Sequence, residues 1–247
     1  MNQFTRTEQL IGADALNKIK QARVAVFGLG AVGSFAVEAL ARVGVGYFSL
    51  VDFDEIEISN INRQIYALHS TIGAKKTIIA KNRIKDINPD SVVKIHDSFV
   101  NAESLGSLLS QDIDVVVDAI DGLNSKVNLI HDAKTKGLKI VSSMGAAGKT
   151  DAMSIKTSDL FDTSICPLAR FVRRRLRRRG ISQGVPCVYS EEKPQKSDEE
   201  MISSLESESS LEDEGHGRKR TSLGSVPYVT GVFGLMVANL VIETIIK

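Results

Sequence analysis

Short apolar runs alternate with stretches of helical periodicity, and this alternation limits the fold of the chain more than any other feature. We predict helices at 34–43, 77–86, 102–109 and 125–136, and strands at 23–28, 47–52, 92–96, 115–120 and 139–142. Such a β-α-β rhythm is typical of a mostly parallel sheet, because right-handed crossovers place helices on both of its faces. The sequence therefore predicts an α/β fold.

The rhythm changes after Gly148, so we divide one domain of 247 residues into a core at 1–150 and an extension at 151–247. The extension contains an arginine-rich helix predicted at 168–179. Residues 191–217 are rich in serine and acidic residues, a composition that predicts a flexible acidic loop. The apolar segment 226–246 is predicted to be a buried helix rather than a membrane span, because proline, glycine and polar residues interrupt it.

Composition and charge narrow the class of protein. With 43% hydrophobic residues, 25% charged residues and a net charge of +1, the chain is expected to be soluble, and any contact with nucleic acid must be local. Cys166 and Cys187 are too few for a disulfide framework or a four-thiolate zinc site, so we expect free thiols and no structural zinc. The first residues form no apolar signal segment. We therefore expect a cytoplasmic protein without a membrane partner.

A glycine-rich loop lies between the first predicted strand and its helix. Gly28, Gly30 and Gly33 have the GxGxxG spacing that lets a backbone approach a phosphate at a helix N-terminus. Asp52 ends the next strand and is placed to bind a ribose. Together with the β-α-β rhythm, these residues predict a Rossmann-like fold, and alone they would favour NAD or FAD.

The following residues favour ATP instead. Arg63 and Lys76 could neutralise a polyphosphate. Asp121 follows the fourth predicted strand at the carboxyl end of the sheet, where ligands bind and where a carboxylate suits Mg²⁺. A solvated polar loop is the alternative for any one of these residues.

These residues also carry a resemblance to a known superfamily. The chain resembles the ubiquitin-activating-enzyme-like superfamily in Arg6, Gly28-Leu-Gly30-Ala-Val-Gly33, Asp52-Phe-Asp54, Ser59-Asn60-Ile-Asn62-Arg63-Gln64, Gly73-Ala-Lys-Lys76 and Asp118-Ala-Ile-Asp121. The resemblance implies a protein that binds ATP and adenylates a carboxylate.

The resemblance also implies a role for each matching residue. Asp52 would bind the ribose, Asn60 and Arg63 the phosphates, Lys76 the reacting phosphate and Asp121 the Mg²⁺. Arg6 matches an arginine that reaches into the partner subunit's site, which implies a homodimer. The remaining residues of the expected nucleotide site are the three glycines, Asp54 and Gln64.

The predicted arginine-rich helix is the most distinctive remaining feature. At helical spacing, one face would carry five arginines, and so many like charges favour an anionic partner such as RNA. These residues are Arg170, Arg173, Arg174, Arg177 and Arg178. A solvated face, or pairing with the acidic segment, is the alternative.

Cys187 could be proposed as a thioester-forming cysteine, but the sequence shows no base beside it, so we interpret it as a bystander thiol.

One branch of the superfamily resembles the chain beyond the nucleotide motifs. Gly145-Ala-Ala-Gly148, the stretch 159–170 with the arginines after it, and 185–190 are similar to the tRNA threonylcarbamoyladenosine dehydratases. In that branch, ATP activates the threonine carboxylate of the modified adenosine, and ring closure yields a cyclic oxazolone with loss of AMP. Expected partners are that tRNA, a second copy of the chain and sulfur-relay proteins.

Two other functions remain open. The first is adenylation of the C-terminus of a ubiquitin-like sulfur carrier, against which stand the arginine helix and the absence of paired CxxC zinc motifs. The second is an ATP-binding scaffold without catalysis, against which stand Arg63, Lys76 and Asp121.

Overall fold

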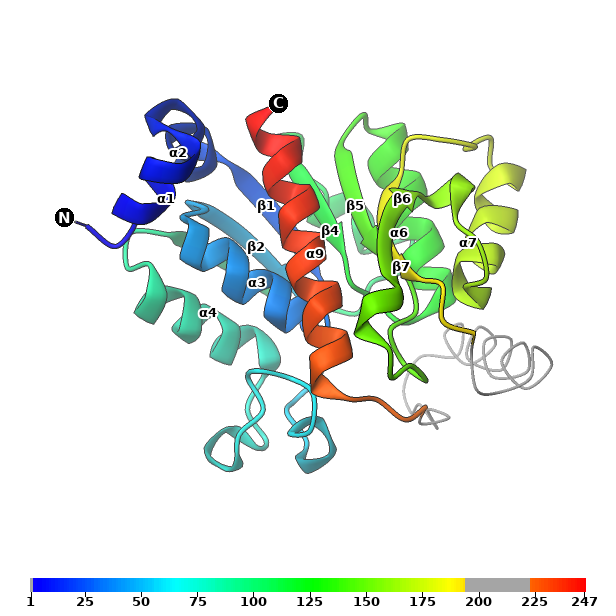
Figure 1. Cartoon of the computed structure of the whole chain (residues 1–247), viewed down its shortest axis with the longest axis horizontal. Helices are drawn as coiled ribbons and strands as arrows, with labels where there is room; N and C mark the ends of the chain where they lie inside the picture. Colours follow the sequence, from blue (N-terminus) through cyan, green and yellow to red (C-terminus); the bar gives the residue numbers. More distant parts are fainter. Residues whose placement is uncertain (1, 194–222) are drawn as a thin grey trace.

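A seven-stranded sheet forms the centre of the molecule in the computed structural model, which describes residues 2–193 and 223–247 (Figure 1). The strand order is β3-β2-β1-β4-β5-β7-β6, and all neighbours are parallel except β6 and β7. The strands are β1 (Arg23–Phe27), β2 (Tyr47–Val51), β3 (Val92–His96), β4 (Val115–Asp118), β5 (Lys139–Ser143), β6 (Ile155–Asp159) and β7 (Pro186–Ser190). The five predicted strands are confirmed within two residues at each end.

Helices cover both faces of the sheet, as expected for parallel strands made of β-branched residues such as those of β1 and β4. Phe27 and Val116 face one apolar cluster, while Val26 and Val117 face the other. The first cluster lies under α5 (Leu105–Leu108), α6 (Leu123–Thr135) and α7 (Pro167–Arg178). The second lies under α2 (Ala13–Gln21), α3 (Gly33–Val43), α4 (Lys76–Ile87) and α9 (Pro227–Ile246).

The helix α9 packs closely on α3. A Cβ atom on Gly234 would lie 2.5 Å from the carbonyl oxygen of Val32 and 2.6 Å from the Cβ of Phe35, so the two helices approach at a glycine. Phe233, Val237 and Val241 are fully buried between α3 and the sheet. The helix is also long and apolar enough to cross a membrane by length and composition, and it is the one such helix in the described part of the chain.

Several elements differ from the sequence predictions. The helix predicted at 102–109 has only four residues, and β6, β7 and the N-terminal helices α1 (Thr5–Ile11) and α2 were not predicted. The acidic segment predicted to be flexible begins with ordered residues: Glu191 forms an ion pair with Lys156 at 2.5 Å, and the Glu192 carboxylate accepts backbone hydrogen bonds from 150 and 151. The rest of that segment, from 194, lies outside the described residues.

Candidate active site

The glycine-rich loop lies where the strand order reverses, between β1 and its two neighbours β2 and β4. A Cβ on Gly28 would lie 2.6 Å from the carbonyl oxygen of Ala119, and one on Gly33 would lie 1.9 Å from that of Gly28. Gly30 differs, because its nearest contact would be the Gln64 side chain at 3.8 Å. Two glycines are therefore needed for packing, whereas Gly30 borders open space at the carboxyl edge of the sheet, where α/β folds bind ligands.

This contrast predicts opposite effects for two single-methyl substitutions. Gly30→Ala should fold with a Tm within about 2 °C of the wild type, since the methyl meets no backbone. It should weaken ATP binding at least about tenfold, because the methyl occupies the space over the loop. Gly33→Ala should instead destabilise the fold by about 3 kcal/mol. Differential scanning fluorimetry and calorimetric ATP titration measure both effects, and unchanged ATP affinity of Gly30→Ala would place the nucleotide elsewhere.

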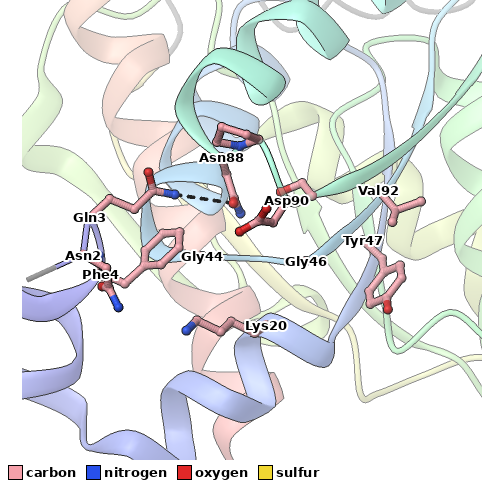
Figure 2. Close-up of a pocket in the computed structure, with 12 residues that line it drawn as sticks. Asn2, Gln3, Phe4, Lys20, Gly44, Gly46, Tyr47, Asn88, Asp90 and Val92 are labelled. Carbon is pink, nitrogen blue, oxygen red and sulfur yellow. Dashed lines mark hydrogen bonds between the residues drawn. The ribbon is translucent and has the colours of Figure 1, made fainter.

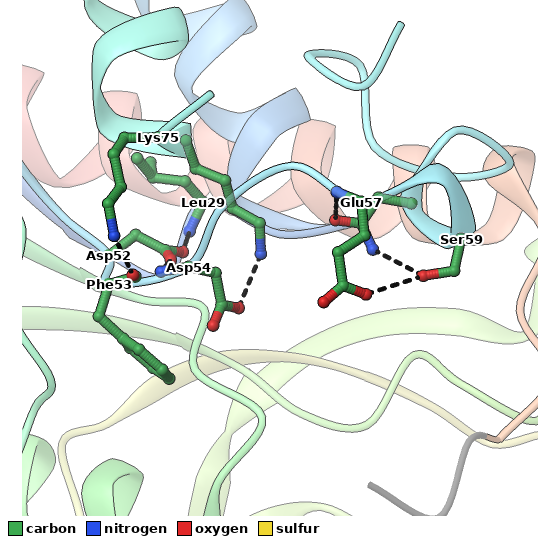
Figure 3. Close-up of polar contacts among 9 residues, drawn as sticks. Leu29, Asp52, Phe53, Asp54, Glu57, Ser59 and Lys75 are labelled. Carbon is green, nitrogen blue, oxygen red and sulfur yellow. Dashed lines mark hydrogen bonds and ion pairs between the residues drawn. The ribbon is translucent and has the colours of Figure 1, made fainter. Parts of the chain in front are cut away.

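Asp52 joins the glycine loop to the residues after β2. Its two carboxylate oxygens accept hydrogen bonds from the backbone N–H groups of Leu29 at 2.7 Å and Asp54 at 2.9 Å (Figure 3). The side chain is buried, and burial raises its pKa despite the nearby Lys76 ammonium and the two N–H donors. The structure thus places Asp52, the carboxylate predicted to bind the ribose, against the glycine loop, and the two hydrogen bonds fix its orientation.

Lys76 begins α4 beside this carboxylate. Its Nζ atom forms a 2.8 Å ion pair with Asp54, and its side chain is only 3% exposed. The neighbouring Lys75 forms ion pairs of 3.4 Å with Glu55 and Asp97 at the surface of the same segment. A buried ammonium next to a partly exposed carboxylate provides the charge that a phosphate oxygen would bind.

The segment after β2 brings the other predicted phosphate-binding residues together. Arg63 donates from Nη1 to the carbonyl oxygen of Ser59 at 2.8 Å and to the side chain of Asn62 at 2.9 Å. Asn60 is buried and accepts a hydrogen bond from the Glu57 N–H at 3.2 Å. Gln64 is buried beside Gly30, and its Oε1 atom has no hydrogen-bond partner. Because a buried amide oxygen without a partner is costly, Gln64 is the strongest sign of a ligand here.

Asp121 lies in the turn between β4 and α6. It is exposed, and Ala119 of the same turn packs against both Gly28 and Gly33. No group of three or more acidic, histidine or cysteine residues could hold a metal ion within 2–193 and 223–247. A single carboxylate still fits Mg²⁺, which takes its other ligands from phosphate oxygens and water when it accompanies a nucleotide.

Arg6 does not join these residues in the same chain. It is exposed on α1, and Phe4, the residue before this helix, packs against Gly44 in the turn before β2. That turn lies at the amino edge of the sheet, one five-residue strand or about 16 Å from the glycine loop. A cavity of about 470 Å³ lies at the same amino edge, lined by Lys20, Tyr47 and Asp90, and contains none of the predicted site residues (Figure 2).

The arginine-rich helix is confirmed as α7, but its arginines are not equivalent. Arg170, Arg174, Arg177 and Arg178 are exposed. Arg173 is half-buried and donates from Nη1 to the carbonyl oxygens of Leu160 at 3.2 Å and Thr163 at 2.9 Å, and to the Thr163 hydroxyl. Burial lowers the pKa of Arg173. Arg173 therefore holds the loop before α7, whereas the other four arginines face solvent, and binding of tRNA by the five residues stays a prediction.

The position of α7 along α6 places its first turns at the carboxyl edge of the sheet. Arg175 donates to Asn124 and Arg179 to Asn128, so both contacts join residues 51 positions apart. An equal separation means that α6 and α7 run parallel with a fixed offset. With a rise of 1.5 Å per residue, the first turns of α7 project about 10 Å beyond the start of α6, on the side of Asp121.

The residue before the N-cap of α7 has a strained backbone. Ile165 has φ of 61°, and the Cys166 N–H donates to the carbonyl oxygen of Ser164 at 2.6 Å, which closes a tight γ-turn. This is a rare conformation for a β-branched residue, and its side chain is 48% exposed. The turn holds the loop in place beside the carboxyl edge of β5, since Cys166 lies next to Gly145.

Relief of this strain should stabilise the protein. We expect Ile165→Gly to raise the free energy of unfolding by about 1 kcal/mol and Tm by about 2–4 °C, because glycine adopts positive φ without a steric penalty. Ile165→Ala keeps a Cβ and should gain less. Thermal melts of the two variants and the wild type test this, and a Tm for Ile165→Gly at or below that of Ile165→Ala contradicts it.

Comparison with known proteins assigns the family. The ThiF family model matches residues 4–247, so the chain belongs to the ThiF family. Among curated relatives, the tRNA threonylcarbamoyladenosine dehydratase of Bacillus subtilis is 42% identical over 194 residues, which cover 78% of this chain and 76% of the relative. The dehydratase of the same name from Escherichia coli K12 is 37% identical over 196 residues, covering 76% and 73%.

A solved structure extends the similarity to nearly the whole fold. The Escherichia coli tRNA N6-threonylcarbamoyladenosine dehydratase in complex with ATP superposes with a TM-score of 0.86 at 31% identity. The match covers 98% of this chain and 93% of that one. The Rossmann-like fold predicted from the sequence is therefore confirmed, including its C-terminal helix.

Proposed function

We propose that this protein dehydrates threonylcarbamoyladenosine in tRNA to its cyclic oxazolone form with ATP. The observation that carries the proposal is the placement of a nucleotide loop and an overhanging arginine helix on one edge of the sheet. Gly30 and Gln64 border the space for the nucleotide, while Arg170 lies on the part of α7 that projects beyond α6. Relatives named as tRNA dehydratases and a neighbour solved with ATP support it.

The first step would join the substrate carboxylate to AMP. A carboxylate oxygen attacks the α-phosphorus of ATP, and pyrophosphate leaves. Negative charge develops on the phosphate oxygens, and cations held in place stabilise it. Lys76 and Arg63 would supply this charge, and Asn60 would donate a hydrogen bond to the phosphates. The unpartnered Oε1 atom of Gln64 would accept from a hydroxyl or amino group of the nucleotide. Asp52 would bind the ribose, with Asp54 holding Lys76 in position.

Mg²⁺ would bind at Asp121 and neutralise part of the polyphosphate charge.

The second step is intramolecular. The carbamoyl oxygen of the substrate attacks the activated carbonyl carbon, a carbamoyl N–H releases its proton, the ring closes, and AMP leaves with one former carboxylate oxygen. This ring closure needs no nucleophile from the protein, in agreement with the burial of Cys166 and Cys187. Burial also raises the pKa of the Cys187 thiol, which suppresses the reactive thiolate.

We also infer a homodimer in which Arg6 completes the site of the partner. The helix α9 spans the sheet from its carboxyl edge to its amino edge (Figure 1). Just before the helix begins, Asn62 contacts Ser225 at the carboxyl edge, and at its end Lys18 contacts the carbonyl oxygen of Ile246 at the amino edge. The outer face of α9 carries Tyr228 and Leu235, each more than half exposed. A two-fold axis across this face would place α1 of one copy at the carboxyl edge of the other.

Mixing two inactive variants tests this arrangement. Arg6→Ala and Lys76→Ala should each abolish AMP release, and their mixture should recover about a quarter of wild-type activity, because half of the dimers are mixed and each has one intact site. Dissociation and reassociation of wild-type protein serves as the control for losses in handling. No recovery in a mixture that mass photometry shows to contain dimers would mean that Arg6 does not act across subunits.

The reaction itself is tested with purified protein, ATP and tRNA that carries threonylcarbamoyladenosine. We expect one AMP and one pyrophosphate per cyclised nucleoside, detected as a loss of water by mass spectrometry of the digested tRNA. A ubiquitin-like carrier protein is assayed in parallel. Adenylation of the carrier without turnover of the tRNA would favour the alternative function. We also propose that the protein acts in the cytoplasm and that sulfur-relay proteins are further partners.

A further inference from the structure

A fully buried ion pair lies directly beneath the turn that carries Asp121. The Nζ atom of Lys126 is 2.7 Å from Oδ2 of Asp118, and neither side chain has any exposed surface. Lys126 also donates to the carbonyl oxygen of Ser143 at 2.8 Å, and the Ser142 hydroxyl donates to Oδ2 of Asp118 at 2.5 Å. The four residues join the end of β4, the end of β5 and the first turns of α6.

The same carboxylate holds the backbone of the turn. The Ile120 N–H donates to Oδ1 of Asp118 at 3.2 Å, and the Ala119 N–H donates to the carbonyl oxygen of Phe27 at 2.8 Å. Ala119 in turn lies against the glycine loop, where a Cβ on Gly28 would meet its carbonyl oxygen at 2.6 Å. The position of Asp121 relative to the glycine loop therefore depends on the buried pair.

Burial of two charges is costly, and apolar residues of similar volume would often stabilise a core as well or better. In the sequence, Lys126 is unusual because it is a charged residue among the apolar residues of α6 that pack under the sheet. A pair with this cost, placed at the edge of a binding site, can be retained because it fixes the geometry of a loop.

We propose that Lys126 and Asp118 are positioning residues that hold the Asp121 turn for the Mg²⁺-bound nucleotide. The ammonium also cancels the Asp118 charge, so the polyphosphate faces no second unpaired carboxylate there. The inference rests on the proposed ATP-dependent function and deepens it, because it assigns the geometry of the metal-bearing turn to two residues that lie beneath it.

The decisive variant removes both charges together. Lys126→Met alone leaves Asp118 charged and buried without its cation, and should unfold readily. The double variant Lys126→Met/Asp118→Asn is neutral and nearly keeps the buried volume, so we expect a Tm close to that of the wild type. One amide oxygen replaces the two carboxylate oxygens that accept from Ile120 and from Ser142, so the turn is held less firmly. The affinity of this variant for ATP with Mg²⁺ should fall about tenfold or more, as for other residues that orient a metal ligand. Affinity for ATP in EDTA should change less than about twofold.

A second readout needs neither metal nor nucleotide. Hydrogen exchange in the free protein should be faster at the Ile120 amide of the double variant, while the strand amides of β4 stay protected. The matched control removes another ion pair at a helix, with Glu38→Gln/Arg83→Met between α3 and α4. That variant should lose stability and keep its Mg²⁺-dependent ATP affinity.

Wild-type Mg²⁺-dependent affinity and Ile120 exchange in a folded double variant would overturn the inference. If the double variant does not fold, Ser142→Ala provides the test, since it removes one hydrogen bond to Asp118 without a charge. It should weaken Mg²⁺-dependent ATP binding by about two- to threefold, and wild-type affinity would again overturn the inference. Failure of the wild-type protein to bind ATP or to release AMP is a different result, which counts against the proposed function.

Discussion

Lys76→Met is expected to lower the rate of AMP formation by about 10²–10³-fold, the usual loss when one fixed group that stabilises developing charge is removed. Lys76 is 3% exposed, so methionine is chosen to keep the buried stem while removing the ammonium that pairs with Asp54. Asp121→Ala should lower the rate by a similar factor through loss of the metal ligand and, being exposed, should fold normally. Pyrophosphate release with modified tRNA measures both effects.

The neighbouring lysine provides a matched control for this prediction. Lys75 also precedes the body of α4 and forms two ion pairs, but these pairs, with Glu55 and Asp97, lie at the surface. Lys75→Met should therefore retain at least about half of the wild-type rate, since surface ion pairs contribute little. If Lys76→Met or Asp121→Ala releases AMP at nearly the wild-type rate, the assignment of the adenylating site is wrong.

Replacement of the exposed arginines of α7 by glutamine should weaken tRNA binding and flatten its salt dependence. The variant changes Arg170, Arg174, Arg177 and Arg178, and it leaves Arg173 to hold the loop through Leu160 and Thr163. Because each phosphate contact releases counterions, loss of four contacts should reduce the slope of log K against log salt by about 3. Filter binding of tRNA over a range of salt concentrations measures the slope, and ATP affinity should not change.

Two further variants distinguish the possible reasons for such an effect. Glutamine at Lys18, Lys20, Lys85 and Lys94 removes the same charge away from α7 and should leave the slope nearly unchanged. A deletion of 195–217 tests pairing between the arginines and the acidic segment, since pairing predicts tighter tRNA binding after the deletion. If the arginine variant keeps the wild-type affinity and salt slope, the arginines form only a solvated face and α7 does not bind the tRNA.

The sequence by itself determined the parts of this protein that depend on neighbouring residues. Five strands, the glycine loop and the arginine helix follow from apolar periodicity and from glycine spacing, which are local signals. Asp52 and Lys76 could also be predicted, since each lies at the end of a recognisable strand or helix, and the structure brings both to the glycine loop. The division into a core at 1–150 and a substrate-binding extension stays a prediction, as do the roles of the site residues in binding ATP, Mg²⁺ and tRNA.

Only the tertiary structure decided the features that depend on residues far apart in the chain. The sequence could not show that β7 pairs with β5, because strand pairing is set by partners outside the strand. The helical spacing put five arginines on one face, but Arg173 contacts Thr163, a residue of the preceding loop whose fold the helix pattern does not contain. Lysine is a residue type that usually lies at the surface. The burial of Lys126 against Asp118 depends on how α6 packs on the sheet. Packing of distant segments, rather than local pattern, decides which charged groups face solvent and which hold the site together.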